Sequence, residues 1–145
     1  MNDAERFRQF CLTTRLDDGS PFVLLPWQLE WADGVFGRID PETGLRITRT
    51  SFLFIPRKNG KTMLNAAAGL FCLVGDEEPY PEVYCAAHDI AQAGRSVEYA
   101  KRLRESNPQL KAMTKLYKHP FRIECPPNAQ THPTCLLYTS PSPRD

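Results

Sequence analysis

The stretch Ile55-Pro56-Arg57-Lys58-Asn59-Gly60-Lys61-Thr62 decides the fold class of this 145-residue chain. It ends in Gly-Lys-Thr, which closes the P-loop (Walker A) pattern G-x-x-x-x-G-K-[ST]. That pattern requires glycine at position 55, where the chain has isoleucine, so the match is incomplete. The alternative is a chance Gly-Lys-Thr in an exposed turn. Because an apolar run precedes the stretch and a helical pattern follows it, we interpret residues 55–62 as a phosphate-binding loop.

The residues of this loop have distinct expected roles in holding ATP and Mg²⁺. Gly60 allows the backbone N–H groups to approach the phosphates closely. Lys61 can reach the β- and γ-phosphates, and the Thr62 hydroxyl can ligate the Mg²⁺ that bridges them. The predicted nucleotide-binding residues of the loop are Arg57, Lys58, Asn59, Gly60, Lys61 and Thr62.

Two further cations lie in the loop, and the sequence leaves the role of one of them open. Arg57 can contact the γ-phosphate from within the same chain and stabilise the charge that develops during phosphoryl transfer. It can equally face solvent or a nucleic-acid partner. For Lys58 we favour the solvent-facing interpretation.

Strand and helix patterns alternate around the loop. The apolar run 51–55 predicts a strand buried on both faces, and residues 82–87 and 121–125 predict two more strands. Helical spacing of apolar residues follows the loop and again follows Asp89, which stands where an N-cap is expected. This order predicts an α/β P-loop NTPase domain with a largely parallel sheet flanked by helices, incomplete at its C-terminal side. Two earlier helices are expected at 3–13 and 27–39.

An apolar run that ends in acids, residues 70–77, resembles the strand that carries the metal-binding and water-activating acids of such ATPases. The same residues are needed for the helix after Lys61, because their apolar positions continue its face. We therefore interpret Asp76, Glu77 and Glu78 as a solvated turn. The hydrolytic carboxylate is expected to be absent from this chain.

The last twenty residues differ in character from the rest, since they contain five of the thirteen prolines. We expect no regular element there. Residues 136–145 are interpreted as unrelated sequence read through at the end of a truncated gene. The predicted organisation is thus a partial P-loop ATPase domain at 1–125 and an irregular, disordered or non-native tail at 126–145.

Composition sets broad limits on function. The net charge is +1, 41% of residues are hydrophobic, and no stretch reaches the roughly 20 apolar residues that span a bilayer. The N-terminus lacks the features of a secretory signal, so an intracellular protein without a membrane role is expected. Five cysteines without a C-x-x-C pair indicate reduced, buried thiols, and three scattered histidines give no metal cluster. A basic stretch at 101–122 can attract polyanions, although a solvated face is the commoner meaning of such a run.

Three motifs together resemble a known family: Leu25-Pro26-Trp27-Gln28, the loop 55–62, and Val83-Tyr84-Cys85-Ala86-Ala87 with Ala91-Gln92-Ala93. They are similar to the start of a tailed-phage terminase large subunit over about Phe22 to Leu110. That family tolerates proline and arginine in a loop without the first glycine. The resemblance implies a RecA-like (ASCE) ATPase fold.

The resemblance also implies a role. Such a motor hydrolyses ATP to package double-stranded viral DNA into procapsids, in the host cytoplasm, as a homo-oligomer with a small subunit and a portal protein. Gln28 would read the adenine edge, although it can equally be a polar residue at a helix start. Arg57 would be an arginine finger supplied in cis, and Gln92 would help to couple nucleotide state to DNA without being catalytic.

A complete member of that family continues to catalytic acids, a coupling motif and a nuclease domain. We therefore expect this chain to bind ATP weakly at most, and neither to hydrolyse it nor to cut DNA. Two other functions stay open. One is a fragment of a helicase-type, nucleic-acid-stimulated ATPase, and the other is a non-catalytic DNA-docking module that uses the basic stretch from Lys101 to Arg122.

Overall fold

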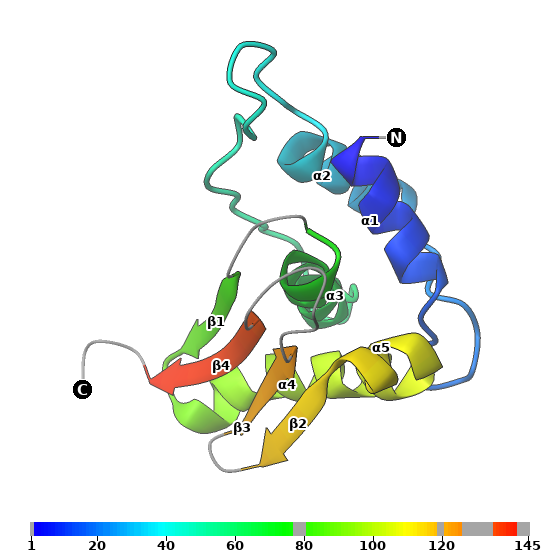
Figure 1. Cartoon of the computed structure of the whole chain (residues 1–145), viewed down its shortest axis with the longest axis vertical. Helices are drawn as coiled ribbons and strands as arrows, with labels where there is room; N and C mark the ends of the chain where they lie inside the picture. Colours follow the sequence, from blue (N-terminus) through cyan, green and yellow to red (C-terminus); the bar gives the residue numbers. More distant parts are fainter. Residues whose placement is uncertain (1, 77–80, 119–120, 126–134, 142–145) are drawn as a thin grey trace. The chain divides into compact units, whose positions relative to one another are not determined.

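The computed structural model describes residues 2–76, 81–118, 121–125 and 135–141 (Figure 1). The chain divides into two compact units, Met1–Lys61 and Thr62–Asp145. Within the described ranges, no helix is both long and apolar enough to cross a membrane.

The first unit contains two helices, α1 (Asp3–Leu12) and α2 (Pro26–Phe36). The Asn2 side chain caps α1 by accepting from the backbone N–H of Glu5 at 2.9 Å. The two helices pack through an aromatic cluster: the Phe7 ring lies 4.9 Å from that of Phe36 and 6.4 Å from that of Trp31, centroid to centroid. The Phe7–Trp31 pair is edge-to-face, a geometry that adds to the stabilisation from burial of the rings.

The chain that follows α2 is held to the two helices by side-chain contacts. Arg46 binds the Asp3 carboxylate, with Nη2 to Oδ2 at 2.8 Å, and its guanidinium lies 5.0 Å from the Phe36 ring centroid. The Thr48 hydroxyl donates to the carbonyl oxygen of Gly34 at 2.7 Å. These contacts lie on the chain shortly before the loop.

The prediction of a strand at 51–55 is wrong, because these residues lie in no strand or helix. Phe52 and Phe54 are each 88% exposed, and their rings stack on one another with centroids 6.4 Å apart. A strand is stable only when a neighbouring strand pairs its N–H and C=O groups. The described residues place no strand beside this segment, so its apolar residues stay in an extended, exposed chain.

The helix after the loop, α3 (Lys61–Val74), begins at the last residue of the first unit and continues into the second. Its range includes Leu70 to Val74, so the apolar run before the acids is helical, as expected. Gly75 follows α3, and a Cβ at this position would lie 2.6 Å from Cδ2 of Phe71. Glu77 and Glu78, part of the predicted acidic turn, lie outside the described residues.

The second unit contains a four-stranded sheet with the order β1-β4-β3-β2. Its further elements are β1 (Glu82–Ala87), α4 (Ile90–Ser106), α5 (Pro108–Met113), β2 (Lys115–Lys118), β3 (Phe121–Cys125) and β4 (Cys135–Pro141). The predicted strands at 82–87 and 121–125 are confirmed. The predicted N-cap role of Asp89 is also confirmed, because its side chain accepts from the backbone N–H of Gln92 at the start of α4, at 2.7 Å.

The prediction of a largely parallel sheet is wrong. Only the β1–β4 pairing is parallel, whereas β2–β3 and β3–β4 are antiparallel. Two residues separate β2 from β3, and so short a connection can join only antiparallel strands. The fold is therefore mixed helix and strand with a small mixed sheet.

The prediction that residues 126–145 contain no regular element is also wrong, since β4 occupies Cys135–Pro141. This strand pairs with both β1 and β3. Pro141, the last residue of β4, is paired with β1 alone, because the β3 pairing ends at Tyr138. The rest of the tail, 126–134 and 142–145, lies outside the described residues.

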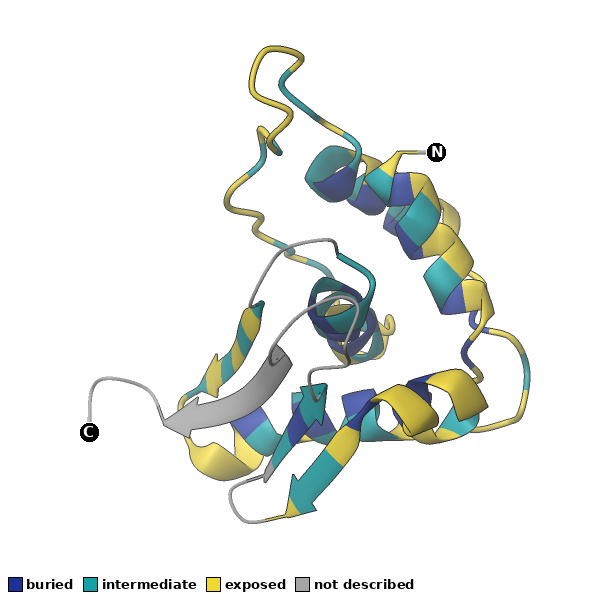
Figure 2. Ribbon diagram, viewed as in Figure 1, coloured by how far each residue is buried: buried dark blue, intermediate teal, exposed yellow. Residues whose placement is uncertain are grey.

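The core of the second unit lies between α4 and the sheet. Helix α4 packs on β1, β3 and β4, and Val97, Ala100, Leu103 and Ile123 are fully buried (Figure 2). Of the cysteines, Cys11 in the first unit is fully buried, and burial raises its pKa to about 12. Cys72, Cys85 and Cys125 are only partly buried, so among the four cysteines whose burial the structure describes, the prediction of buried thiols is confirmed for Cys11.

Candidate phosphate-binding loop

The backbone of the loop alternates in handedness directly before a helix. Lys58 has φ 67° and Gly60 has φ 75°, and these are the only positive values among the described residues of the loop. Residues 57, 59 and 61 therefore have negative φ. In an anion-binding nest, residues with negative and positive φ alternate and their N–H groups turn towards one concave side, and the sign of φ in this loop follows that pattern. Lysine is uncommon in the left-handed region, and such strain concentrates at functional sites.

Two side chains tie the loop to its own backbone. The Lys61 ammonium donates to the carbonyl oxygen of Ile55 at 3.2 Å, and Asn59 Nδ2 donates to the carbonyl oxygen of Pro56 at 3.2 Å. The first bond joins the two ends of the loop. Lys61 thus lies at the loop, with two of its three N–H donors not used by that carbonyl.

Gln28 lies beside the loop, within the same unit. It is only 3% exposed, and a Cβ placed on Gly60 would lie 3.5 Å from its Nε2 atom. Gln28 Oε1 accepts from the backbone N–H of Leu25 at 2.8 Å, which fixes the orientation of the amide, since that partner can only donate. The side-chain N–H₂ group therefore faces Gly60. The structure thus brings together two residues that are separate in the sequence and were both predicted for the site.

The other predicted loop residues are exposed. Arg57, Lys58 and Thr62 reach solvent, and the described residues provide no hydrogen bond or ion pair to the side chains of Arg57 or Lys58. Thr62 is the second residue of α3, where a hydroxyl and the helix N-terminus are both available to a phosphate or to its Mg²⁺. Their roles towards ATP and Mg²⁺ stay predictions. Among the described residues, no three His, Cys, Asp or Glu side chains are grouped to hold a metal.

The basic stretch at 101–122 has a different character, and its centre is Arg104. This residue is 6% exposed. Its Nε donates to Thr114 Oγ1 at 2.6 Å, and its Nη2 donates to the carbonyl oxygens of Thr114 and Lys111 at 2.7 and 3.3 Å. Its Nη1 pairs with Glu105 at 2.6 Å. Arg104 therefore joins the end of α4 to the turn after α5, and it is a structural residue that the sequence did not reveal.

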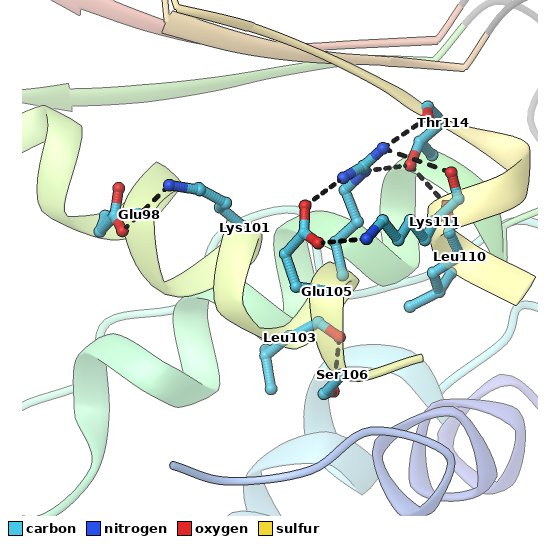
Figure 3. Close-up of polar contacts among 9 residues, drawn as sticks. Glu98, Lys101, Leu103, Glu105, Ser106, Leu110, Lys111 and Thr114 are labelled. Atoms are coloured by element: carbon cyan, nitrogen blue, oxygen red, sulfur yellow. Dashed lines mark hydrogen bonds and ion pairs between the residues drawn. The ribbon is translucent and has the colours of Figure 1, made fainter. Parts of the chain in front are cut away.

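Neighbouring cations of this stretch also form ion pairs with acidic side chains (Figure 3). Lys111 binds Glu105 at 3.1 Å, and this hydrogen bond lowers the pKa of the Glu105 carboxyl. Lys101 lies 3.7 Å from Glu98. Further cations stack on tyrosines, Arg102 over Tyr99 and Arg122 over Tyr117. The stretch is mostly held by its own acids and rings, which weakens its interpretation as a polyanion patch.

The units described above define a mixed helix–strand fold with a candidate phosphate-binding loop at the start of a helix. The structure is similar to the crystal structure of the HK97 bacteriophage large terminase, with a TM-score of 0.78 and 25% sequence identity. The similarity covers 97% of this chain and 27% of that terminase. It confirms the predicted resemblance to a terminase large subunit. No protein-family model matches the sequence, and no curated protein matches it.

Proposed function

We propose that this chain is the nucleotide-binding part of a terminase large subunit, the ATP-driven motor that packages double-stranded viral DNA into procapsids. The observation that carries the proposal is the alternating backbone of residues 57–61, placed at the start of α3 and beside Gln28. The similarity to a large terminase supports the same conclusion and favours it over a helicase-type ATPase.

The residues present fit a nucleoside triphosphate with Mg²⁺. The inward N–H groups of the loop and the N-terminus of α3 supply donors to the phosphate oxygens. Lys61 supplies the positive charge, and it can exchange the Ile55 carbonyl for a more negative phosphate oxygen. Thr62 supplies a hydroxyl to Mg²⁺, which neutralises charge between the β- and γ-phosphates when it is bound. Arg57 is exposed on the same loop and is the candidate arginine finger.

Gln28 is suited to the base rather than to the phosphates. Its Oε1 is already used by Leu25, so the atoms most available to a ligand are the two hydrogens of Nε2. A donor of this kind fits the ring-nitrogen acceptor on the edge of a purine. Its remaining oxygen lone pair can accept from the adenine amino group.

The remaining parts of the proposal concern the whole motor. By resemblance to terminase large subunits, the partners are viral DNA, a small subunit, a portal protein and further copies of the same subunit. The place of action is the host cytoplasm.

Isothermal titration of the 145-residue chain with Mg·ATP tests the nucleotide site. Lys61→Ala removes a charge-assisted contact of about 1.5–3 kcal/mol, so the dissociation constant should rise about 10- to 100-fold. Lys118→Ala is the matched control, because Lys118 is an exposed lysine on β2. Equal affinities for the wild type and Lys61→Ala, or no binding by the wild type, would contradict the proposal.

A further inference from the structure

Two of the contacts that helix α2 makes with the loop-bearing chain lie on either side of residues 52–59. At one end, Trp31 Nε1 donates to Ser51 Oγ at 2.9 Å. At the other end, Gln28 lies beside Gly60. Gln28 and Trp31 are three residues apart on the helix, so both project from one face of α2.

The Trp31 contact has a fixed direction. An indole N–H can only donate, and the ring itself is held edge-on against Phe36, with centroids 5.9 Å apart. The second ring in this cluster, Phe7, comes from α1. Ser51 is therefore held at a position set by the α1–α2 packing rather than by its own neighbours.

The chain between these two points has few other restraints. Residues 51–55 form neither helix nor strand, and the two hydrogen bonds within the loop, from Asn59 and Lys61, end on the loop's own backbone. The tether before Ser51 is the bond from Thr48 to Gly34. Among the described residues, the Trp31–Ser51 bond is thus the last side-chain hydrogen bond between α2 and the chain before the loop begins.

We propose that Trp31 is a positioning residue for nucleotide binding. Through Ser51 it holds the phosphate loop at the distance from Gln28 at which one nucleotide can contact both. Trp31 does not touch the nucleotide in this arrangement. The inference rests on the proposed nucleotide site and goes beyond it, because it assigns the base–phosphate spacing to a hydrogen bond outside the site.

Two ligands separate this role from a general effect on folding. Mg·tripolyphosphate needs only the loop, whereas Mg·ATP needs the loop and Gln28 at the correct spacing. Trp31→Phe keeps an aromatic ring in the cluster and removes the donor. It should weaken Mg·ATP about three- to tenfold, the effect of losing one hydrogen bond, and leave Mg·tripolyphosphate unchanged in isothermal titration.

Three further variants make the test decisive. Ser51→Ala removes only an exposed acceptor and should reproduce the effect, and the double variant should be no weaker than either single one. Trp27→Phe is the matched control, one turn earlier on α2, and should bind both ligands as the wild type does. Equal losses for both ligands, or unchanged Mg·ATP affinity in Trp31→Phe and Ser51→Ala, would overturn the inference. A wild type that binds neither ligand would instead refute the nucleotide site itself.

Discussion

The phosphate loop and the α4–α5 junction both place a basic side chain beside backbone carbonyls, yet they use it differently. At the junction, Arg104 is buried and contacts four oxygen atoms of its own chain. In the loop, Lys61 contacts one carbonyl, and its neighbours Arg57 and Lys58 are exposed. The number of donors already used within the chain, rather than the charge, separates a structural cation from one available to a ligand.

The difference also explains why the sequence predicted the role of the loop residues but not that of Arg104. The loop is read from a contiguous motif, and its glycine, lysine and threonine act within a few residues of each other. The acceptors of Arg104 lie up to ten residues away, on the far side of α5. That short helix begins at Pro108, directly after the Asn107 cap, and was not predicted.

The largest expected effect is at the junction. Arg104→Met keeps the apolar stem but leaves the two buried oxygens of Thr114 without their donor. Loss of such a partner should lower the free energy of unfolding by about 3 kcal/mol, measured by urea denaturation. Arg102→Ala is the matched control: it is exposed on the same helix, and loss of its stacking on Tyr99 should cost only about 0.5 kcal/mol.

Equal destabilisation by the two arginine variants would show that burial and acceptors do not distinguish them. Arg104 would then not be the structural cation that its contacts indicate.

A smaller effect is expected from backbone handedness in the loop. Gly60→Ala places a Cβ at positive φ and should lower the stability by about 1 kcal/mol. The added Cβ makes only an ordinary contact with Gln28, so the cost comes from the backbone. Lys58→Gly should act in the opposite direction by up to about 1 kcal/mol, because glycine accepts the same φ without strain.

Thermal unfolding of both variants measures these changes. A stabilising Gly60→Ala or a strongly destabilising Lys58→Gly would show that the loop does not have this alternating backbone.

Local signals in the sequence predicted local structure well. Asp89 and Asn107-Pro108 mark the two ends of α4, and the spacing of Val97, Ala100 and Leu103 gives its buried face. These features need only neighbouring residues. The resemblance to a terminase large subunit was equally accessible, because its motifs are short and contiguous.

The pairing of strands that are distant in the sequence could not be predicted in the same way. The run 51–55 has the composition of a buried strand, yet strand formation depends on a partner that composition does not specify. For the same reason the antiparallel pairings and β4 were missed. The Trp31–Ser51 bond joins residues twenty positions apart, and no local pattern in the sequence predicts it.

An amide ¹H–¹⁵N NMR titration of the whole chain with Mg·tripolyphosphate tests whether residues 58–62 bind phosphate. We predict that the backbone N–H signals of residues 58–62 shift with added ligand, because these groups would donate to the phosphates, whereas those of residues 110–114 at the Arg104 junction do not. A titration in which the loop signals stay unchanged, or in which the junction responds instead, would contradict it.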